Sequence, residues 1–146
     1  MEAGVDKIEI CLMEPTDIDS ILVIDRNISG LERAITYGID QVIGGQFNLS
    51  FIAKVNDKVV GFVLASLMYV PEKTAEVCVI QTIGVDPRYQ RKGIATQLID
   101  AVSKTAHDKD IKTIRVMIDR NDKQLQGFFQ HLGFQEGRIV NYTKDL

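Results

Sequence analysis

Hydrophobic and polar residues alternate with a two-residue period near the start of the chain, over residues 7–13. This period is typical of a half-buried strand. Two further strand-like runs, residues 49–55 and 58–70, flank the pair Asn56-Asp57. Asn and Asp tolerate positive φ and bond their own backbone, so the pair predicts a hairpin turn between two antiparallel strands.

Helical spacing of apolar residues appears in four segments. Residues 15–28 carry such a stripe, with Thr16 as the expected N-cap. A second helical pattern covers residues 31–43 and stops at two glycines. The third runs from residue 94 to about residue 108, and the fourth covers residues 122–132. Four helices are therefore expected.

The remaining segments complete a sheet. Residues 76–85 are rich in β-branched side chains, and Gly84 suggests a bulge or a close backbone approach there. Residues 111–118 predict one more strand, and two short strands are expected around Gly137. This order of elements predicts an α+β (mixed α/β) fold in which helices flank a central sheet. We expect one domain over residues 1–146.

Composition narrows the class of protein. The chain has 146 residues, 45% hydrophobic and 25% charged, with a net charge of −3. These values are those of a soluble globular protein and argue against nucleic-acid binding. No apolar run is long enough for a membrane span, and the start lacks the pattern of a signal peptide, so a cytoplasmic location is expected. Cys11 and Cys78 form no CxxC pair and are read as reduced core thiols.

One segment carries candidate chemistry. The strand ending at Asp86-Pro87 is followed by Arg91, Lys92 and Gly93, and then by a helix. A helix N-terminus offers unpaired N–H groups and partial positive charge, and glycine lets the backbone approach a ligand. The pattern indicates a phosphate or pyrophosphate site, although the glycine spacing is neither that of a Walker loop nor that of a dinucleotide fold. The alternative is an ordinary exposed helix start.

The segment resembles the signature of the GNAT superfamily of acetyl-coenzyme A-dependent N-acetyltransferases, Gln/Arg-x-x-Gly-x-Gly/Ala. Gln90, Gly93 and Ala95 fill its three defined positions, after a matching Val-x-Pro turn. Downstream, residues 121–134 are similar to the family's segment in which an Asn precedes a short helix that ends in Leu-Gly-Phe. The resemblance covers nearly the whole chain. It implies a mostly antiparallel sheet whose splayed strand pair holds the cofactor.

The resemblance implies acetyl-CoA as co-substrate. Main-chain N–H groups of residues 91–96 would hold the pyrophosphate, and the backbones of Ile83 and Val85 would pair with the pantetheine arm like an added strand. The Val85 N–H would also serve as oxyanion donor. The residues implied to bind the cofactor are Ile83, Gly84, Val85, Gln90, Arg91, Lys92, Gly93, Ile94, Ala95, Thr96, Asn121, Phe128 and Phe129.

The sequence departs from the family pattern at the catalytic positions. Phe129 stands where many members have a Tyr that protonates the leaving thiolate, and Val79 where many have a Glu base. Glu76 is on the same strand, but its odd separation from Val79 predicts the opposite face, so it is a candidate base or only a solvated charge. Gln81 has the right parity to hold a water. Tyr142 is a candidate acid or a packing residue.

Other candidates are weaker. Asn121 or Asp122 would touch the cofactor or cap the helix that follows. Arg33 and Tyr37 lie one helical turn apart in the region where the superfamily forms its acceptor pocket, and would orient an acceptor or form an exposed pair. The two histidines stand alone, so no metal site is expected.

Three functions are compatible with these residues. The first is an N-acetyltransferase that moves the acetyl group directly to a primary amine, because no Cys is placed as an acyl carrier beside a His. The absence of an evident base favours an amine of low pKa. The second is a catalytically silent acyl-CoA sensor, and the third an interaction domain with an empty cradle. The expected partners are acetyl-CoA and an amine, with no nucleic acid, no membrane and a possible homodimer.

Overall fold

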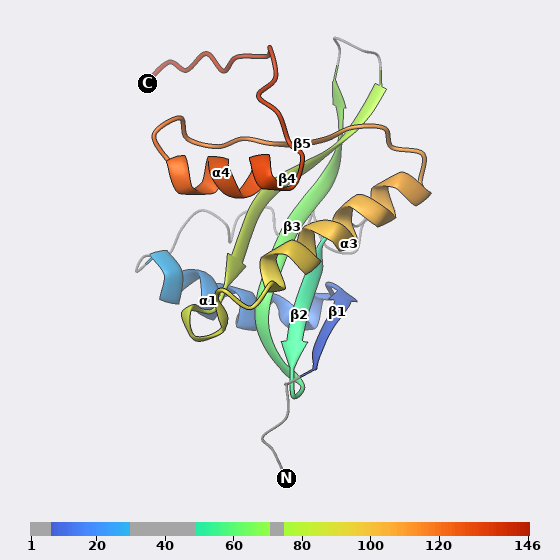
Figure 1. Cartoon of the computed structure of the whole chain (residues 1–146), viewed down its shortest axis with the longest axis vertical. Helices are drawn as coiled ribbons and strands as arrows, with labels where there is room; N and C mark the ends of the chain where they lie inside the picture. The colour runs from blue at the N-terminus through green and yellow to red at the C-terminus, as the bar shows by residue number, and fades with distance from the viewer. Residues whose placement is uncertain (1–6, 30–48, 71–74) are drawn as a thin grey trace.

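The computed structural model describes residues 7–29, 49–70 and 75–146. Its helices and strands are, in chain order, β1 (Ile8–Leu12), the 3-10 turn η1 (Pro15–Asp17), α1 (Ile18–Ser29), β2 (Phe51–Val55), β3 (Lys58–Val70), β4 (Ala75–Val85), the 3-10 turn η4 (Pro87–Tyr89), α3 (Ile94–Asp108), β5 (Ile114–Val116) and α4 (Lys123–His131) (Figure 1).

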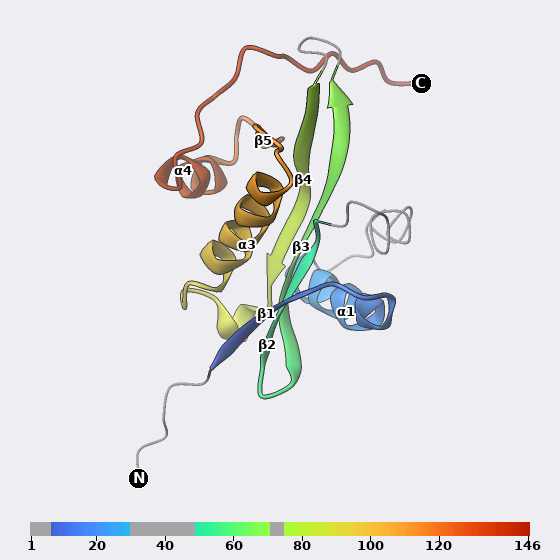
Figure 2. The same cartoon turned by 90° about the vertical axis from the view of Figure 1, so that its right-hand side faces the viewer.

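Within these residues, five strands form one sheet in the order β1-β2-β3-β4-β5. Neighbours from β1 to β4 are antiparallel, whereas β4 and β5 are parallel. A parallel pair needs a crossover connection, which α3 supplies. Figure 2 shows α3 and α4 on one face of the sheet and α1 on the other. The predicted mixed fold with a mostly antiparallel sheet and flanking helices is confirmed.

The β2–β3 hairpin turns at the residues that the sequence predicts. Asn56 and Asp57 have φ values of 51° and 65°, and Val55 pairs with Lys58 on either side of them. Positive φ at both central residues matches the right-handed twist of the flanking strands. The hairpin prediction is confirmed.

Each face of the sheet has its own hydrophobic core, because successive strand residues point to opposite faces. On the α3 face, Leu98, Ile99 and Val102 are fully buried and pack with strand residues such as Ile80. On the α1 face, Ile21 packs in a cluster with Met13 and Phe62 from the sheet side. Each fully buried aliphatic side chain contributes about 1.5–3 kcal/mol. The two cores hold the connection between β4 and α3 against the sheet.

The first helical segment starts differently from the prediction. Thr16 is exposed inside η1 and is not the N-cap. Instead, the Glu14 N–H donates to the carboxylate of the buried Asp17 at 2.8 Å. The N–H of the N-cap residue, Glu14, has no backbone partner in the helical turn. The carboxylate three residues later accepts it, so that this N–H is not left to water.

The β4 bulge lies at Gln81, which corrects the expectation of a bulge at Gly84. Thr82 pairs with Leu64 and Ile80 with Ala65, so Gln81 is an extra residue in β4. Gly84 pairs regularly with Phe62. The close approach at Gly84 is that of the Phe62 ring, because a Cβ there would lie 2.8 Å from a ring carbon.

The C-terminal segment also differs from its prediction. Residues 135–146 contain neither strand nor helix, so the two strands expected around Gly137 are not formed. Ile139, Val140 and Tyr142 are exposed. A strand needs a partner for its backbone groups, and this segment has none within the sheet. The helix predicted over residues 31–43 lies outside the described residues.

Candidate active site

The connection between β4 and α3 is fixed by Asp86. Its N–H donates to the Val60 carbonyl at 2.8 Å. Its carboxylate accepts the Arg88 N–H at 2.9 Å, which caps η4, and pairs with the Arg88 guanidinium at 3.3 Å. Burial alone would raise the pKa of Asp86, but these bonds and the charges of Arg88 and Lys58 lower it below its usual value. Asp86 is therefore an anion that holds the turn in place.

The turn then presents backbone N–H groups to solvent. Arg91 and Gly93 have φ values of 64° and 82°, in the left-handed region. Gly93 is the N-cap of α3 and offers no side-chain cap, so the first N–H groups of α3 remain available. A Cβ at Gly93 would meet nothing within 4 Å. Residues 91–96, named the cradle below, form an open turn at a helix N-terminus, which suits an anion.

Charge in the cradle is positive. Arg91 and Lys92 are exposed, and within the described residues neither has an ion-pair partner. Arg88, by contrast, is engaged by Asp86. Two free cations beside a helix N-terminus attract a phosphate or pyrophosphate.

Beside the cradle, β4 has an unpaired edge. β5 pairs with β4 only from Cys78 to Ile80. Beyond that point, residues 81–85 of β4 pair with β3 alone among the described strands. This stretch is named the open edge below, and it begins at the Gln81 bulge.

Two residues turn their backbone groups outward from the open edge. In an antiparallel pair, residues whose groups bond the partner strand alternate with residues whose groups point away. The bond from the Asp86 N–H to Val60 marks Asp86 as bonded to β3, and the register is regular from Val85 back to Ile83. The N–H and C=O groups of Ile83 and Val85 therefore point away from β3. Gly84, between them, faces β3.

One outward group already has a partner. The Gln90 side-chain amide donates to the Val85 carbonyl at 3.0 Å. The Ile83 carbonyl and the N–H groups of Ile83 and Val85 have no such partner within the described residues. The open edge thus offers two donors and one acceptor.

Helix α4 and the residues after it bring three aromatic side chains to the α3 face of the sheet. Phe129 is 1% exposed and lies edge-on between Phe128 and Phe134, with ring centroids 5.1 and 5.0 Å away. It belongs to the core on the α3 face. Asp122 accepts the Leu125 N–H at 3.0 Å, so it caps α4. Of the two alternatives for Asp122, the structure shows the cap.

The catalytic candidates lie apart from one another. Glu76 is exposed near the start of β4, roughly 23 Å along the strand from Ile83. Val79 is 4% exposed, and the regular register between the two residues puts them on opposite faces, as expected. The exposed Gln81 donates from its side-chain amide to the Ser66 hydroxyl at 3.0 Å. Tyr142 is 92% exposed and, contrary to the prediction, is not on a strand.

Arg33 and Tyr37 lie outside the described residues, so their role at an acceptor pocket stays a prediction. In the part of the chain that the structure covers, no three His, Cys, Asp or Glu side chains gather as a metal site. Among the same residues, no helix is both long and apolar enough to cross a membrane.

The two cysteines are free thiols. Cys78 is fully buried in the core on the α3 face, and burial raises its pKa to about 11. A thiol with that pKa stays protonated near neutrality and is a poor nucleophile. Cys11 is half-buried. Cys78 is thus the core thiol that the sequence predicts.

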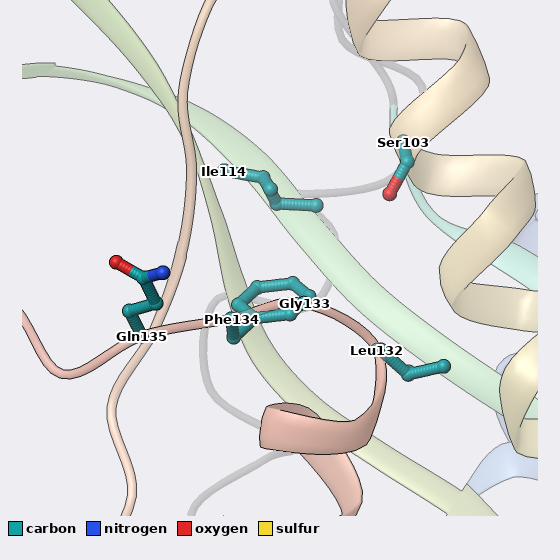
Figure 3. Close-up of a pocket in the computed structure, with 6 residues that line it drawn as sticks. All are labelled: Ser103, Ile114, Leu132, Gly133, Phe134 and Gln135. Atoms are coloured by element: carbon teal, nitrogen blue, oxygen red, sulfur yellow. The ribbon is translucent and has the colours of Figure 1, made fainter.

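A separate hollow of about 370 Å³ lies away from the cradle (Figure 3). Ser103 of α3, Ile114 of β5 and residues 132–135 after α4 line it. It shares no residue with the cradle or the open edge, and none of the predicted site residues lines it.

Sequence reasoning missed three polar contacts of this region. Asp86 could have been found, because an Asp directly before a Pro that starts a helical turn is a common cap. The bond between Gln90 and Val85 and the bond between Gln81 and Ser66 have no local signal. Both depend on where β4 lies in the sheet.

Comparisons with known proteins agree with the geometry. The model of the Acetyltransferase (GNAT) family matches residues 21–134. An uncharacterized N-acetyltransferase of Methanocaldococcus jannaschii is 31% identical over 91 residues, 62% of this chain and 40% of that protein. The L-2,4-diaminobutyric acid acetyltransferase of Marinococcus halophilus is 27% identical over 99 residues, 65% of this chain and 56% of that enzyme. The chain thus spans about half the length of these relatives.

Among solved structures, an aminoglycoside N-acetyltransferase in complex with CoA superposes with a TM-score of 0.81 and 23% sequence identity, and the match covers 100% of both chains. At this identity the likeness shows the fold. Together with the family match over residues 21–134, it establishes that this chain belongs to the GNAT acetyltransferase family.

Proposed function

We propose that this chain is an N-acetyltransferase that moves the acetyl group of acetyl-CoA to a primary amine, with both substrates bound together. One observation carries the proposal: an anion cradle at the start of α3 adjoins an open edge of β4 in a chain of the GNAT family. An anion site and a row of unpaired strand groups, placed end to end, fit a ligand with a pyrophosphate and an amide-bearing arm.

The residues present fit CoA. N–H groups of residues 91–96 would hold the pyrophosphate, with Arg91 and Lys92 adding charge. The outward groups of Ile83 and Val85 would pair with the pantetheine amides as an added strand does. Gly93 leaves space for close approach, since a Cβ there would point into the open site. The roles of Asn121, Phe128 and Phe129 in binding CoA stay predictions.

Bound acetyl-CoA supplies an activated thioester. The Ile83 N–H is the proposed donor to the thioester oxygen, in place of the Val85 N–H expected from the sequence. The thioester ends the arm opposite the pyrophosphate, and Ile83 lies on the open edge two residues farther from the cradle than Val85. The amine nitrogen forms a bond to the acetyl carbon, the carbon–sulfur bond breaks, and the amine loses a proton. No acyl-cysteine step is included, because neither cysteine lies on the open edge or in the cradle: Cys78 is buried in the core, and Cys11 is on β1, three strands away from β4.

Proton transfer limits the choice of acceptor. Phe129 has no proton to give, but a thiol of pKa near 8.5 leaves without an acid at a cost of roughly 1.5–2 kcal/mol. A Lys amine is neutral only about one part in a thousand at pH 7.4, whereas an α-amine is neutral about a quarter of the time. Glu76, Gln81 and Tyr142 stay candidates for proton transfer. Acceptors with a low-pKa primary amine are therefore favoured.

Two of the similar proteins are named for amine-bearing acceptors: L-2,4-diaminobutyric acid for the Marinococcus enzyme and aminoglycosides for the solved structure. We extend this to a primary amine as acceptor for this chain. A cytoplasmic location and a homodimer are part of the same proposal.

Two measurements test the function. Calorimetric titration should show that CoA binds, and thiol release from acetyl-CoA should appear with at least one amine among L-2,4-diaminobutyrate, an aminoglycoside and a peptide that begins with alanine. Binding without thiol release from any amine would identify the acyl-CoA sensor instead. No binding of CoA would identify an interaction domain.

A further inference from the structure

The Gln90 side chain occupies an unusual position between the two halves of the proposed site. Gln90 follows η4 in extended conformation, at φ −72° and ψ 160°, and directly precedes the cradle. Its side-chain amide reaches back to the Val85 carbonyl, five residues earlier, at 3.0 Å. This hydrogen bond connects the residue directly before the cradle to the last residue of the open edge.

The carbonyl that Gln90 takes is one of the outward groups of β4. Val85 turns its N–H and C=O away from β3, toward the side where β5 no longer pairs. An added strand would place one of its N–H groups beside that carbonyl. The Gln90 amide fills this place with an N–H donor of its own.

We propose that Gln90 is a positioning residue and makes no contact with the cofactor itself. Its bond fixes the spacing between the open edge and the cradle. It also leaves the Ile83 carbonyl as the acceptor, and the Ile83 and Val85 N–H groups as the donors, for the pantetheine arm. The arm is thereby held in one register along β4. This inference rests on the proposed binding of CoA.

The energetic consequence is confined to the arm. With the bond in place, the arm meets groups that are already ordered, so less conformational freedom is lost on binding. Without it, the Val85 carbonyl is free, the arm can pair in a second register, and the spacing to the cradle relaxes. The pyrophosphate should still find the N–H groups of residues 91–96, because the Gln90 side chain bonds to Val85 and not to any of these residues.

The test separates the two halves of the ligand. Calorimetry of Gln90→Leu should show CoA affinity reduced by about tenfold, or about 1.4 kcal/mol. Binding of 3′-phospho-ADP, which has the pyrophosphate but no arm, should change by less than about twofold. Gln97→Leu is the matched control, since Gln97 is an exposed glutamine within the first turn of α3, and it should leave both ligands unaffected.

Each other outcome overturns the inference. Equal losses for CoA and 3′-phospho-ADP would mean that Gln90 only helps the cradle to fold, and unchanged affinity for both would mean that the bond has no role. Failure of the unmodified protein to bind CoA would reject the proposed function, and this inference with it. Thermal melting of Gln90→Leu shows whether the fold is retained.

Discussion

Gly93 and Arg91 share a backbone conformation that L residues seldom adopt. Their φ values are 82° and 64°. Arg91 accepts this conformation at some cost, while Gly93 does so freely. At this scale, the proposed anion site depends on backbone geometry more than on side-chain chemistry.

Gly93→Val should weaken CoA binding more than about tenfold, or about 1.4 kcal/mol, because a β-branched residue is strained at this φ and blocks close approach of the pyrophosphate. Gly133→Val is the control, since Gly133 has a φ of 96° and equally open surroundings but lies outside the cradle. It should lower the melting temperature and leave affinity unchanged. Calorimetric titration of both variants with CoA is the measurement. Unchanged CoA affinity in Gly93→Val would show that the cradle does not bind the pyrophosphate.

Phe129 illustrates a residue whose position in the family motif suggests chemistry and whose surroundings are those of a core. Its ring is 1% exposed between Phe128 and Phe134. Phe129→Leu should lower the melting temperature, because a buried ring is lost, and keep kcat within about an order of magnitude. Melting curves and steady-state kinetics check this. A collapse of kcat with CoA affinity intact would show that Phe129 takes part in the reaction.

At the scale of elements, the connection from β4 to α3 matters most. The strand loses its β5 partner after Ile80, bulges at Gln81 and ends in the turn that Asp86 caps. Each event is small. Together they leave an unpaired strand edge that ends next to the N-terminus of α3. If β5 paired with β4 along its whole length, this edge would not be free.

Asp86→Ala should lower the free energy of unfolding at pH 7 by about 1–2 kcal/mol, the usual cost of losing a cap. The folded state lowers the pKa of Asp86. Its stabilisation is therefore fully present above the unfolded pKa of about 3.9 and is lost as pH falls through the folded value.

Urea unfolding of wild type and Asp86→Ala should thus differ at pH 7 and differ less at the lowest pH at which both fold. Asp100→Ala, which changes an exposed Asp on α3, is the control and should have little effect. A gap between wild type and Asp86→Ala that stays constant down to low pH would contradict the role given to the carboxylate.

At the scale of the whole molecule, the two faces of the sheet are kept apart. Figure 2 shows α3 and α4 on one face and α1 on the other. Ser66 lies two residues after Leu64 on β3, so alternation puts the Gln81–Ser66 pair on the α1 face. Glu76 lies far along β4 from the open edge. Among the described residues, no carboxylate lies on the open edge itself.

The pH dependence of the rate tests this arrangement. If no side chain deprotonates the acceptor, kcat/KM should rise about tenfold per pH unit below the pKa of the amine, with no separate enzyme inflection near pH 6–7. Profiles with two amines of different pKa, in wild type and Glu76→Gln, provide the measurement. An inflection that stays fixed when the amine changes, and that disappears in Glu76→Gln, would make Glu76 the base.

The sequence by itself determined the features that depend on neighbours along the chain. The Asn56-Asp57 turn, the extent of α3 and the glycine at the cradle follow from local φ preferences and periodicity. The cofactor expected there came from the resemblance. Tertiary structure decided the rest: the bulge at Gln81, the outward groups of Ile83 and Val85, and the Gln90 bond. The bulge and the outward groups depend on the register with β3 and on where β5 stops pairing, and these contacts join residues far apart in the chain. The Gln90 bond spans only five residues, but it depends on the same register, because the register turns the Val85 carbonyl away from β3.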